Sequence, residues 1–271
     1  MIRPMPNLIR RQKQSATVAS RDYVQSFVKG LDVIRAFDTG HTDMTLSEVA
    51  TRANLTRAAA RRLLLTLVEE RYATTDGKHF RLAPRTLDLG FAYLSSSDIW
   101  ESTQTVLTDV TRQIGESCSA SGLDGHEIVY VARVAASRIM AVDLRVGSRL
   151  PAFHTSMGRV LLAHLPEVEL DKLMAGRRFE KFTAKTVTDP VKIRHILKKT
   201  RSQGWCLANQ ELELGLMSIA VPLRDRLGRV AASINVSSHA GRATPQDMMD
   251  SMLPVLQSAA AQIESLQMRR V

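Results

Sequence analysis

The sequence is short of the residues on which several structural classes depend. Only two of its 271 residues are cysteines, Cys118 and Cys206, which excludes a disulfide framework and a cysteine-rich zinc site and fits a reducing cytoplasm. No apolar run approaches the roughly 18–20 residues of a membrane-spanning helix. The basic N-terminal segment also lacks the continuous apolar stretch of a secretory signal. We therefore expect a cytoplasmic protein without a membrane partner.

Patterns typical of catalysis and metal binding are missing as well. The histidines form no HExxH pair and no short metal-binding spacing. Ser156 lies in His-Thr-Ser-Met-Gly, which is not the Gly-x-Ser-x-Gly turn of a hydrolase nucleophile. The acidic pair Glu211 and Glu213 has a spacing that is common on solvated strands. We therefore expect no catalytic residue, no metal and no cofactor, and we do not expect an enzyme.

Basic residues, by contrast, are in excess. The chain has 37 Lys and Arg against 27 Asp and Glu, a net charge of +10. Residues 1–90 alone carry fifteen basic and nine acidic side chains, so the excess is concentrated in the first third. A basic region favours a polyanionic partner such as nucleic acid, although a moderate excess also serves solubility alone.

The first ninety residues show the order of elements of a winged helix-turn-helix. Thr45-Leu-Ser-Glu48 is a capping box that opens a short helix, and Asp76-Gly77 is a hairpin turn between two strand-like runs. The expected elements are helices at 26–37, 45–53 and 57–71 and strands at 72–75 and 79–82.

The helix expected at 57–71 has the surface of a DNA-reading helix. Ala60, Leu63, Leu64 and Leu67 form an inward stripe, which leaves arginines and small alanines on the outside. Arginine can bond guanine edges or phosphates, and alanine permits close approach to the groove. The alternative is a solvated basic helix. The predicted DNA contacts are Thr45, Thr56, Arg57, Ala58, Ala59, Arg61, Arg62, Lys78 and Arg81.

The remainder of the chain alternates helical and strand-like segments. Runs at 118–123 and 127–134 flank Asp124-Gly125 and indicate a hairpin, and further strands are expected at 139–146, 205–208, 218–223 and 230–236. Helices around hairpin-linked strands predict a mixed α/β domain with an antiparallel sheet. The expected division is a flexible basic arm at 1–22, a winged helix-turn-helix at 23–90, a linker helix at 91–115 and a second domain at 116–271.

Several segments resemble a known family. Residues 26–37, 46–50 and 60–67 are similar to the DNA-binding domain of IclR-family transcriptional regulators. Residues 146–163 and 209–222 resemble the effector domain of the branch that regulates protocatechuate, 4-hydroxybenzoate and β-ketoadipate catabolism. The resemblance spans roughly residues 23–268.

The resemblance implies an α+β fold with an N-terminal winged helix-turn-helix, a linker helix and a C-terminal GAF-like α/β effector domain with an antiparallel sheet. It further implies a homodimer, often paired into a homotetramer, that binds a roughly palindromic double-stranded DNA operator. The effector would be a small aromatic acid or a β-ketoadipate-like dicarboxylic acid. The competing interpretation is a small-molecule-binding module or enzyme with a vestigial basic helical domain.

Carried over to this sequence, the resemblance places an effector site at the start of the helix after Pro151. Backbone N–H groups of Ser156–Gly158 would hold a carboxylate, and alternating residues on strands would form polar ends and an apolar wall. The predicted site residues are Met140, Val142, Leu144, Arg149, His154, Thr155, Ser156, Met157, Gly158, Glu211, Ser218, Asn235 and Ser237.

Each of these residues also has a structural explanation. Thr155 or Ser156 could simply cap the helix, and Arg149 could form a surface ion pair. Asn235, Ser237 and Glu211 could make structural hydrogen bonds, and Met140–Leu144 could belong to the core. Met217 and His154 depart from the family pattern, and both are expected beside the pocket.

Overall fold

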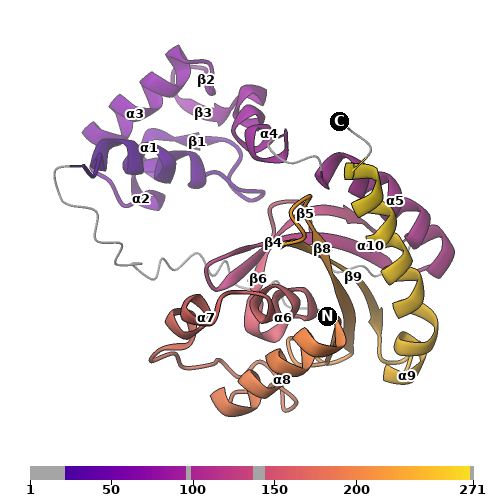
Figure 1. The fold of residues 1–271 in the computed structure, drawn as a ribbon. Helices are drawn as coiled ribbons and strands as arrows, with labels where there is room; N and C mark the ends of the chain where they lie inside the picture. Colours follow the sequence, from indigo (N-terminus) through magenta and orange to yellow (C-terminus); the bar gives the residue numbers. More distant parts are fainter. Residues whose placement is uncertain (1–21, 96–98, 137–143, 269–271) are drawn as a thin grey trace. The chain divides into compact units, whose positions relative to one another are not determined.

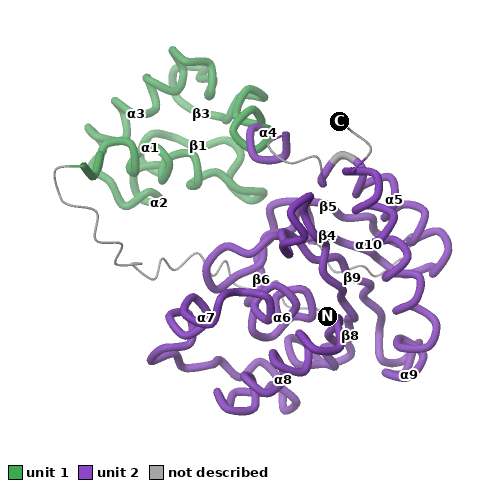
Figure 2. Tube along the Cα trace, viewed as in Figure 1, with its two compact units in different colours: residues 1–91 green, residues 92–271 purple. Residues whose placement is uncertain are grey.

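The computed structural model describes residues 22–95, 99–136 and 144–268. Contacts divide the chain into two compact units, residues 1–91 and 92–271, which Figure 2 colours separately. Most of the arm predicted at 1–22, and the larger part of the strand predicted at 139–146, lie outside the described residues. None of the described helices is long and apolar enough to cross a membrane.

Between residues 22 and 86 the first unit contains three α-helices and a three-stranded antiparallel sheet. Thr45 caps the second helix through the capping box with Glu48, and Thr56 caps the third. A core around Val33, Leu64 and Phe80 holds the helices against the sheet. The elements are α1 Gln25–Arg35, β1 Met44–Thr45, α2 Leu46–Arg52, α3 Arg57–Glu69, β2 Ala73–Thr75, β3 His79–Leu82 and a 3-10 turn at Pro84–Thr86.

The predicted helices and hairpin are confirmed, and strand β1 is an addition. The strands have the order β1-β3-β2, with Met44 opposite Phe80 and Thr75 opposite the same Phe80 on the other side. A two-residue strand has no periodicity of its own, so only its long-range pairing identifies it. This pairing fixes the hairpin, which is the wing, to the start of α2.

The second unit is built around a six-stranded antiparallel sheet with the order β6-β5-β4-β9-β8-β7. Its centre is the pairing of β4 with β9, which joins strands about a hundred residues apart in the sequence. The strands are β4 Ser117–Asp124, β5 Glu127–Val134, β6 Arg149–Pro151, β7 Cys206–Asn209, β8 Leu216–Arg224 and β9 Val230–His239. Described residues 144–148 form no strand, and β6 follows directly after them, whereas residues 139–143 of the predicted strand lie outside the described residues.

Helices cover both faces of this sheet (Figure 1). One face packs on α5 and α10 in a core that includes Leu107, Ile219 and Ile234, and the other faces α6 in a core that includes Met157 and Ala220. Helix α4 Leu87–Ser95 spans the division between the two units. The helices of the second unit are α5 Ile99–Ile114, α6 Ser156–Ala163, α7 Glu167–Met174, α8 Pro190–Gln203, α9 Pro245–Asp247 and α10 Leu253–Met268, with a 3-10 turn at Ala152–His154 and a π-helical turn at Met248–Met252.

The segment predicted as a linker helix at 91–115 contains the end of α4 and all of α5. Val106, Leu107 and Val110 of α5 are buried in the same core as α10. This helix is therefore a structural layer of the second unit as well as the connection that leads into it. The exact domain limits stay a prediction.

Candidate functional site

The exposed side of α3 presents the basic residues that the sequence predicts for DNA binding. Ala60 and Leu64 are buried, and Arg57, Arg61 and Arg62 are exposed together with Thr56 and Ala58, while Ala59 is half-buried. The Thr56 hydroxyl accepts a hydrogen bond from the Ala59 N–H at 3.2 Å, so the cap fixes the first turn. An exposed helix start with positive side chains matches a phosphate or base edge in charge and shape.

The remaining predicted DNA residues have additional structural partners. The Thr45 hydroxyl donates to Glu48 Oε2 at 2.8 Å, which commits it to the start of α2. Arg81 is exposed but pairs with Asp43 at 2.8 Å, and this partner raises the pKa of the arginine. Lys78 is exposed in the wing turn beside Asp76, whose pKa is lowered to about 2 by backbone N–H donors. The wing therefore carries mixed charge, and Lys78 is the cation nearest its tip.

The start of α6 is the centre of the predicted effector site. Thr155 is the N-cap, and its hydroxyl accepts from the Gly158 N–H at 3.2 Å. One of the three N–H groups predicted to hold a carboxylate is thus used by the cap, and the carboxylate contact at Gly158 stays a prediction. Gly158 has another role, because a Cβ there would lie 2.1 Å from the Ala152 carbonyl oxygen.

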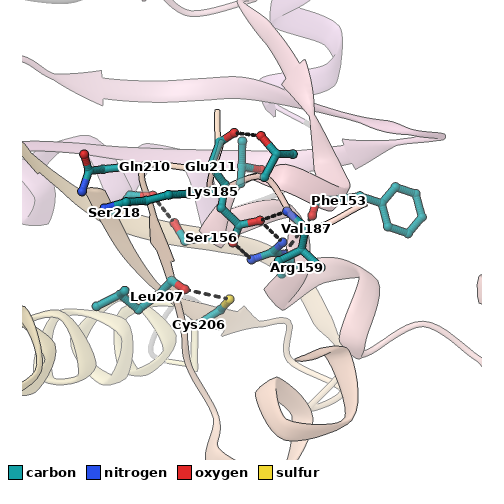
Figure 3. A network of polar contacts seen from close by, with 12 residues as sticks. Phe153, Ser156, Arg159, Lys185, Val187, Cys206, Leu207, Gln210, Glu211 and Ser218 are labelled. Carbon is teal, nitrogen blue, oxygen red and sulfur yellow. Dashed lines mark hydrogen bonds and ion pairs between the residues drawn. The ribbon is translucent and has the colours of Figure 1, made fainter. Parts of the chain in front are cut away.

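The sheet face below α6 is polar. Ser156 and Ser218 hydroxyls lie 2.8 Å apart, which joins the helix start to β8 as Figure 3 shows. On β9 the Asn235 side chain donates from Nδ2 to Ser237 Oγ at 3.0 Å. Asn235 is 3% exposed, and its Oδ1 has no hydrogen-bond partner among the described residues. The structure therefore brings the predicted residues of α6, β8 and β9 to one face.

Three residues of this face were missed by the sequence analysis: Ser119, Ser121 and Arg133. Ser119 lies opposite Asn235 on one side and opposite Arg133 on the other. The Ser121 hydroxyl donates to the Met157 sulfur at 3.3 Å. The pairing shifts between Ala120 and Ser121, and this β-bulge leaves Val131 as the extra residue of β5.

The bulge explains why Arg133 was missed. Ile128 and Tyr130 belong to the core on the α6 face, so strict alternation along β5 would direct Arg133 to the opposite face. The extra residue, Val131, changes the phase, and Arg133 instead lies in register with Ser119. Its guanidinium donates to Ser119 Oγ at 3.1 Å. A bulge of this kind leaves no clear mark in a single sequence.

A buried ion pair fixes α6 to the neighbouring loops (Figure 3). Arg159, 1% exposed, donates to both carboxylate oxygens of Glu211 and, from Nε, to the Phe153 carbonyl at 2.8 Å. Glu211 also accepts from the Val187 N–H at 3.0 Å. The Glu211 carboxylate is therefore engaged in structural contacts, which favours the structural alternative, and its role as an effector contact stays a prediction.

His154 is buried rather than placed at an open pocket mouth. It is 4% exposed and lies against the rings of Phe179 and Phe182. Burial, reinforced by the positive charge of Arg159, lowers the pKa of His154 to about 4. The imidazole is neutral near pH 7, and its Nδ1 has no partner among the described residues.

Two other predicted positions lie away from this face. Met217 is buried on the opposite side of the sheet, in the core with α5 and α10, because it alternates with Ser218 along β8. Its expected place beside the pocket is wrong. Arg149 forms ion pairs with Asp124 and with Glu127, the latter at 2.8 Å. These contacts match the surface ion pair that was the structural alternative for this residue.

The predicted apolar wall is described only in part. Leu144 packs against the core on the α6 side, as its alternative assignment to the core also implies, and its role in an effector wall stays a prediction. Met140 and Val142 lie outside the described residues.

Two further observations concern other kinds of site. A surface hollow of about 310 Å³ lies between α7 and α8 and contains none of the predicted site residues. Its lining residues are Asp171, Met174, Ala175, Pro190, Val191 and Arg194. Within the described ranges no three His, Cys, Asp or Glu side chains gather in a way that could hold a metal ion.

A winged helix with a basic recognition helix, followed by an α/β domain with a polar site under one helix, defines a DNA-binding regulator with a ligand-binding domain. Residues 26–77 match the IclR helix-turn-helix domain, and residues 91–265 match the C-terminal domain of bacterial transcriptional regulators of the IclR type. The chain belongs to the IclR family of transcriptional regulators.

Individual relatives indicate a branch within the family. The chain is 41% identical over 240 residues to the Pca regulon regulatory protein of Pseudomonas putida, covering 88% of this chain and 82% of the relative. It is 33% identical over 257 residues to the p-hydroxybenzoate hydroxylase transcriptional activator of Acinetobacter baylyi, covering 93% and 95%.

A solved structure of a related ligand-binding domain agrees with this branch. The structure is a double mutant of the PobR inducer-binding domain from Acinetobacter in complex with 3-hydroxybenzoic acid. It is 33% identical to this chain, with a TM-score of 0.57, and the match covers 61% of this chain and 97% of that one.

Proposed function

We propose that this regulator controls genes of aromatic-compound catabolism, in the cytoplasm, in response to a small aromatic or dicarboxylic acid. The observation that carries the proposal is the pairing of an exposed basic α3 with a polar sheet face under α6, in a chain whose relatives regulate the Pca regulon and p-hydroxybenzoate hydroxylase. Candidate effectors are 4-hydroxybenzoate, protocatechuate and the ring-cleavage product β-ketoadipate.

DNA contact is assigned to the first turns of α3. Arg57 and Arg61 lie one helical turn apart on the exposed side, so both can reach the same groove. Thr56, Ala58, Ala59 and Arg62 complete the approach, and Lys78 in the wing would contact flanking phosphate. Thr45 and Arg81 contribute less, because each has an internal partner.

The functional unit is proposed to be a homodimer that can pair into a tetramer. One recognition helix reads only a few base pairs, so a specific operator needs two copies and approximate two-fold symmetry. In α4, Leu87 is 76% exposed and Phe91 is 67% exposed, which gives an apolar strip that a second copy would cover. A 30 kDa species in light scattering, free and on DNA, would refute the dimer.

Fluorescence anisotropy with the DNA upstream of the adjoining genes tests the whole proposal. The protein should bind this duplex, and the affinity should fall steeply as salt rises, because phosphate contacts release counterions. Adding 4-hydroxybenzoate, protocatechuate or β-ketoadipate at saturating concentration should change the operator affinity. Acetate at the same concentration is the control. If none of the three acids changes the affinity for any adjoining upstream region, the effector class is wrong.

A further inference from the structure

One row of side chains crosses the α6 face of the sheet from β5 to β8. Arg133, Ser119, Asn235 and Ala220 are successive register partners on four neighbouring strands. Register partners on adjacent strands share a face, so these side chains line one continuous strip. The strip has a cation at one end and a buried amide in the middle.

The Arg133 side chain, at the cationic end, extends toward the middle of the strip. Arg133 donates to Ser119 Oγ at 3.1 Å, which brings its guanidinium over β4, the strand next to the one that carries Asn235. Neighbouring strands are spaced by about 4.8 Å. A guanidinium has a planar set of donors that matches a carboxylate in a bidentate contact. Arg133 is thus placed to hold a carboxylate beside Ser119.

The middle of the strip lacks a hydrogen-bond donor. Asn235 directs its Nδ2 to Ser237, and its buried Oδ1 has no donor among the described residues. A buried acceptor without a partner is costly, so a ligand that supplies a donor gains affinity. A hydroxyl group supplies that donor, whereas a second carboxylate would place one acceptor against another.

An apolar cover lies over the strip. Met157 of α6 is 1% exposed, and its sulfur contacts the Ser121 hydroxyl on the same sheet face. A thioether packs favourably against an aromatic ring. The guanidinium lies over β4 and Asn235 lies on the next strand, so the two groups are separated by about one strand spacing, ~4.8 Å. This separation is comparable with the length of one substituted ring.

We propose that Arg133 binds the effector carboxylate and that Asn235 Oδ1 accepts a hydrogen bond from a ring hydroxyl, so that the site selects hydroxylated aromatic acids. This inference rests on the proposed function and assigns its specificity to two residues. The competing class, a dicarboxylic acid such as β-ketoadipate, satisfies Arg133 but not Asn235.

Calorimetry of the full-length protein with three compounds separates the two contacts. The compounds are 4-hydroxybenzoate, 4-hydroxybenzamide, which lacks the charge, and benzoate, which lacks the hydroxyl. The parent protein should bind 4-hydroxybenzoate at least about tenfold more tightly than either analogue, as expected when one charged or one buried hydrogen bond is removed. Arg133→Gln should abolish the preference for acid over amide, and Asn235→Ala the preference for 4-hydroxybenzoate over benzoate.

Matched variants keep the test decisive. Arg149→Gln removes a cation that is engaged at the surface with Asp124 and Glu127, and it should leave all three affinities unchanged. Arg133→Lys keeps the charge without the planar fork, so it should lower the acid-to-amide ratio partially even if the glutamine variant fails to fold. An unchanged ratio in a folded Arg133 variant, or in Asn235→Ala, contradicts the assignment of that residue.

The outcome distinguishes this inference from the proposed function. If 4-hydroxybenzoate binds the parent and changes operator affinity while the variants keep the parental ratios, the regulator responds to aromatic acids through other residues. If β-ketoadipate binds the parent more tightly than 4-hydroxybenzoate, the selection of hydroxylated aromatic acids is refuted. If none of these compounds binds the parent, the effector class proposed for the protein fails as well.

Discussion

The helices α3 and α6 begin in the same way and serve different purposes. Each follows a threonine N-cap whose hydroxyl accepts from the third N–H of the helix at 3.2 Å, Thr56 from Ala59 and Thr155 from Gly158. The first turn of α3 is largely exposed and basic, whereas all eight residues of α6 are buried. The local sequence therefore sets where a helix starts, and the surroundings of that start decide whether it meets DNA or packs on a sheet.

The difference is sharpest at the third residue of each helix. At Gly158 a Cβ would overlap the Ala152 backbone, so Gly158→Ala should destabilise the second unit by more than about 3 kcal/mol, above the usual cost of overpacking. Ala59→Gly in α3 should cost no more than about 1 kcal/mol. Urea unfolding of both variants measures the contrast. Similar losses would mean that α6 is not held by its close approach to Ala152.

The residue before the second cap makes the protein sensitive to acid. Burial lowers the pKa of His154 to about 4 from an unfolded value near 6.5, so the unfolded chain binds the extra proton between these values. Above pH 6.5 the imidazole is neutral in both the folded and the unfolded chain, so it does not lower the free energy of unfolding. As pH falls from 6.5 toward 4, the unfolded chain takes up the proton first, and the free energy of unfolding decreases by up to about 3 kcal/mol.

The position before Thr56 is Leu55, which does not titrate, and it provides the contrast with α3. The free energy of unfolding should be measured at pH 7 and pH 4.5 for the parent and for His154→Gln. The variant should lose less stability between the two pH values. Equal losses in both proteins would show that His154 does not control the acid response.

The exposed helix should tolerate changes that α6 would not. Arg57→Ala and Arg61→Ala should weaken operator binding by about 1–3 kcal/mol each and relax sequence specificity, with the thermal unfolding temperature unchanged. Operator and random-sequence duplexes compared by anisotropy give both quantities. Glu69→Ala, at the other end of α3, is the matched control. Parental operator affinity in both arginine variants would contradict this orientation of the helix.

The smallest expected difference is between the stability losses caused by removing the two N-cap hydroxyls. Thr155→Ala leaves the buried Gly158 N–H without an acceptor, while Thr56→Ala leaves an N–H that water can reach. We expect losses of about 2 and about 1 kcal/mol in unfolding free energy. The replacements Thr155→Ser and Thr56→Ser should recover most of each loss. A larger loss at Thr56 would reverse the comparison.

The sequence predicts more of the fold than of the effector site. The capping box at Thr45–Glu48 and the Asp76-Gly77 turn are local, so the winged helix-turn-helix could be derived from short-range chemistry. The face of Ser218, Asn235 and Ser237 follows from strand alternation, and those residues do share the α6 side. These features need only neighbours within a few positions.

The positions that could not be predicted depend on partners far along the chain. Glu211 is fixed by Arg159, fifty-two residues earlier, and no local pattern distinguishes it from an effector contact. Met217 was expected beside the pocket as a departure from the family pattern, although Met217 and Ser218 are adjacent in a strand and therefore face opposite sides. Arg133 was missed because a bulge changed the phase of its strand.

That bulge has a consequence for how the protein can be altered in evolution or engineering. Val131 is one residue more than regular pairing with β4 requires, and the bulge absorbs this surplus so that Arg133 still lies opposite Ser119. Deleting Val131 would leave Tyr130 opposite Ser121, Ala132 opposite Ala120 and Arg133 opposite Ser119, so regular pairing would keep the cation on the same face of the sheet. The proposed preference for acids should therefore survive this one-codon deletion, because it depends on the register of β5 with β4 and not on the number of residues in β5.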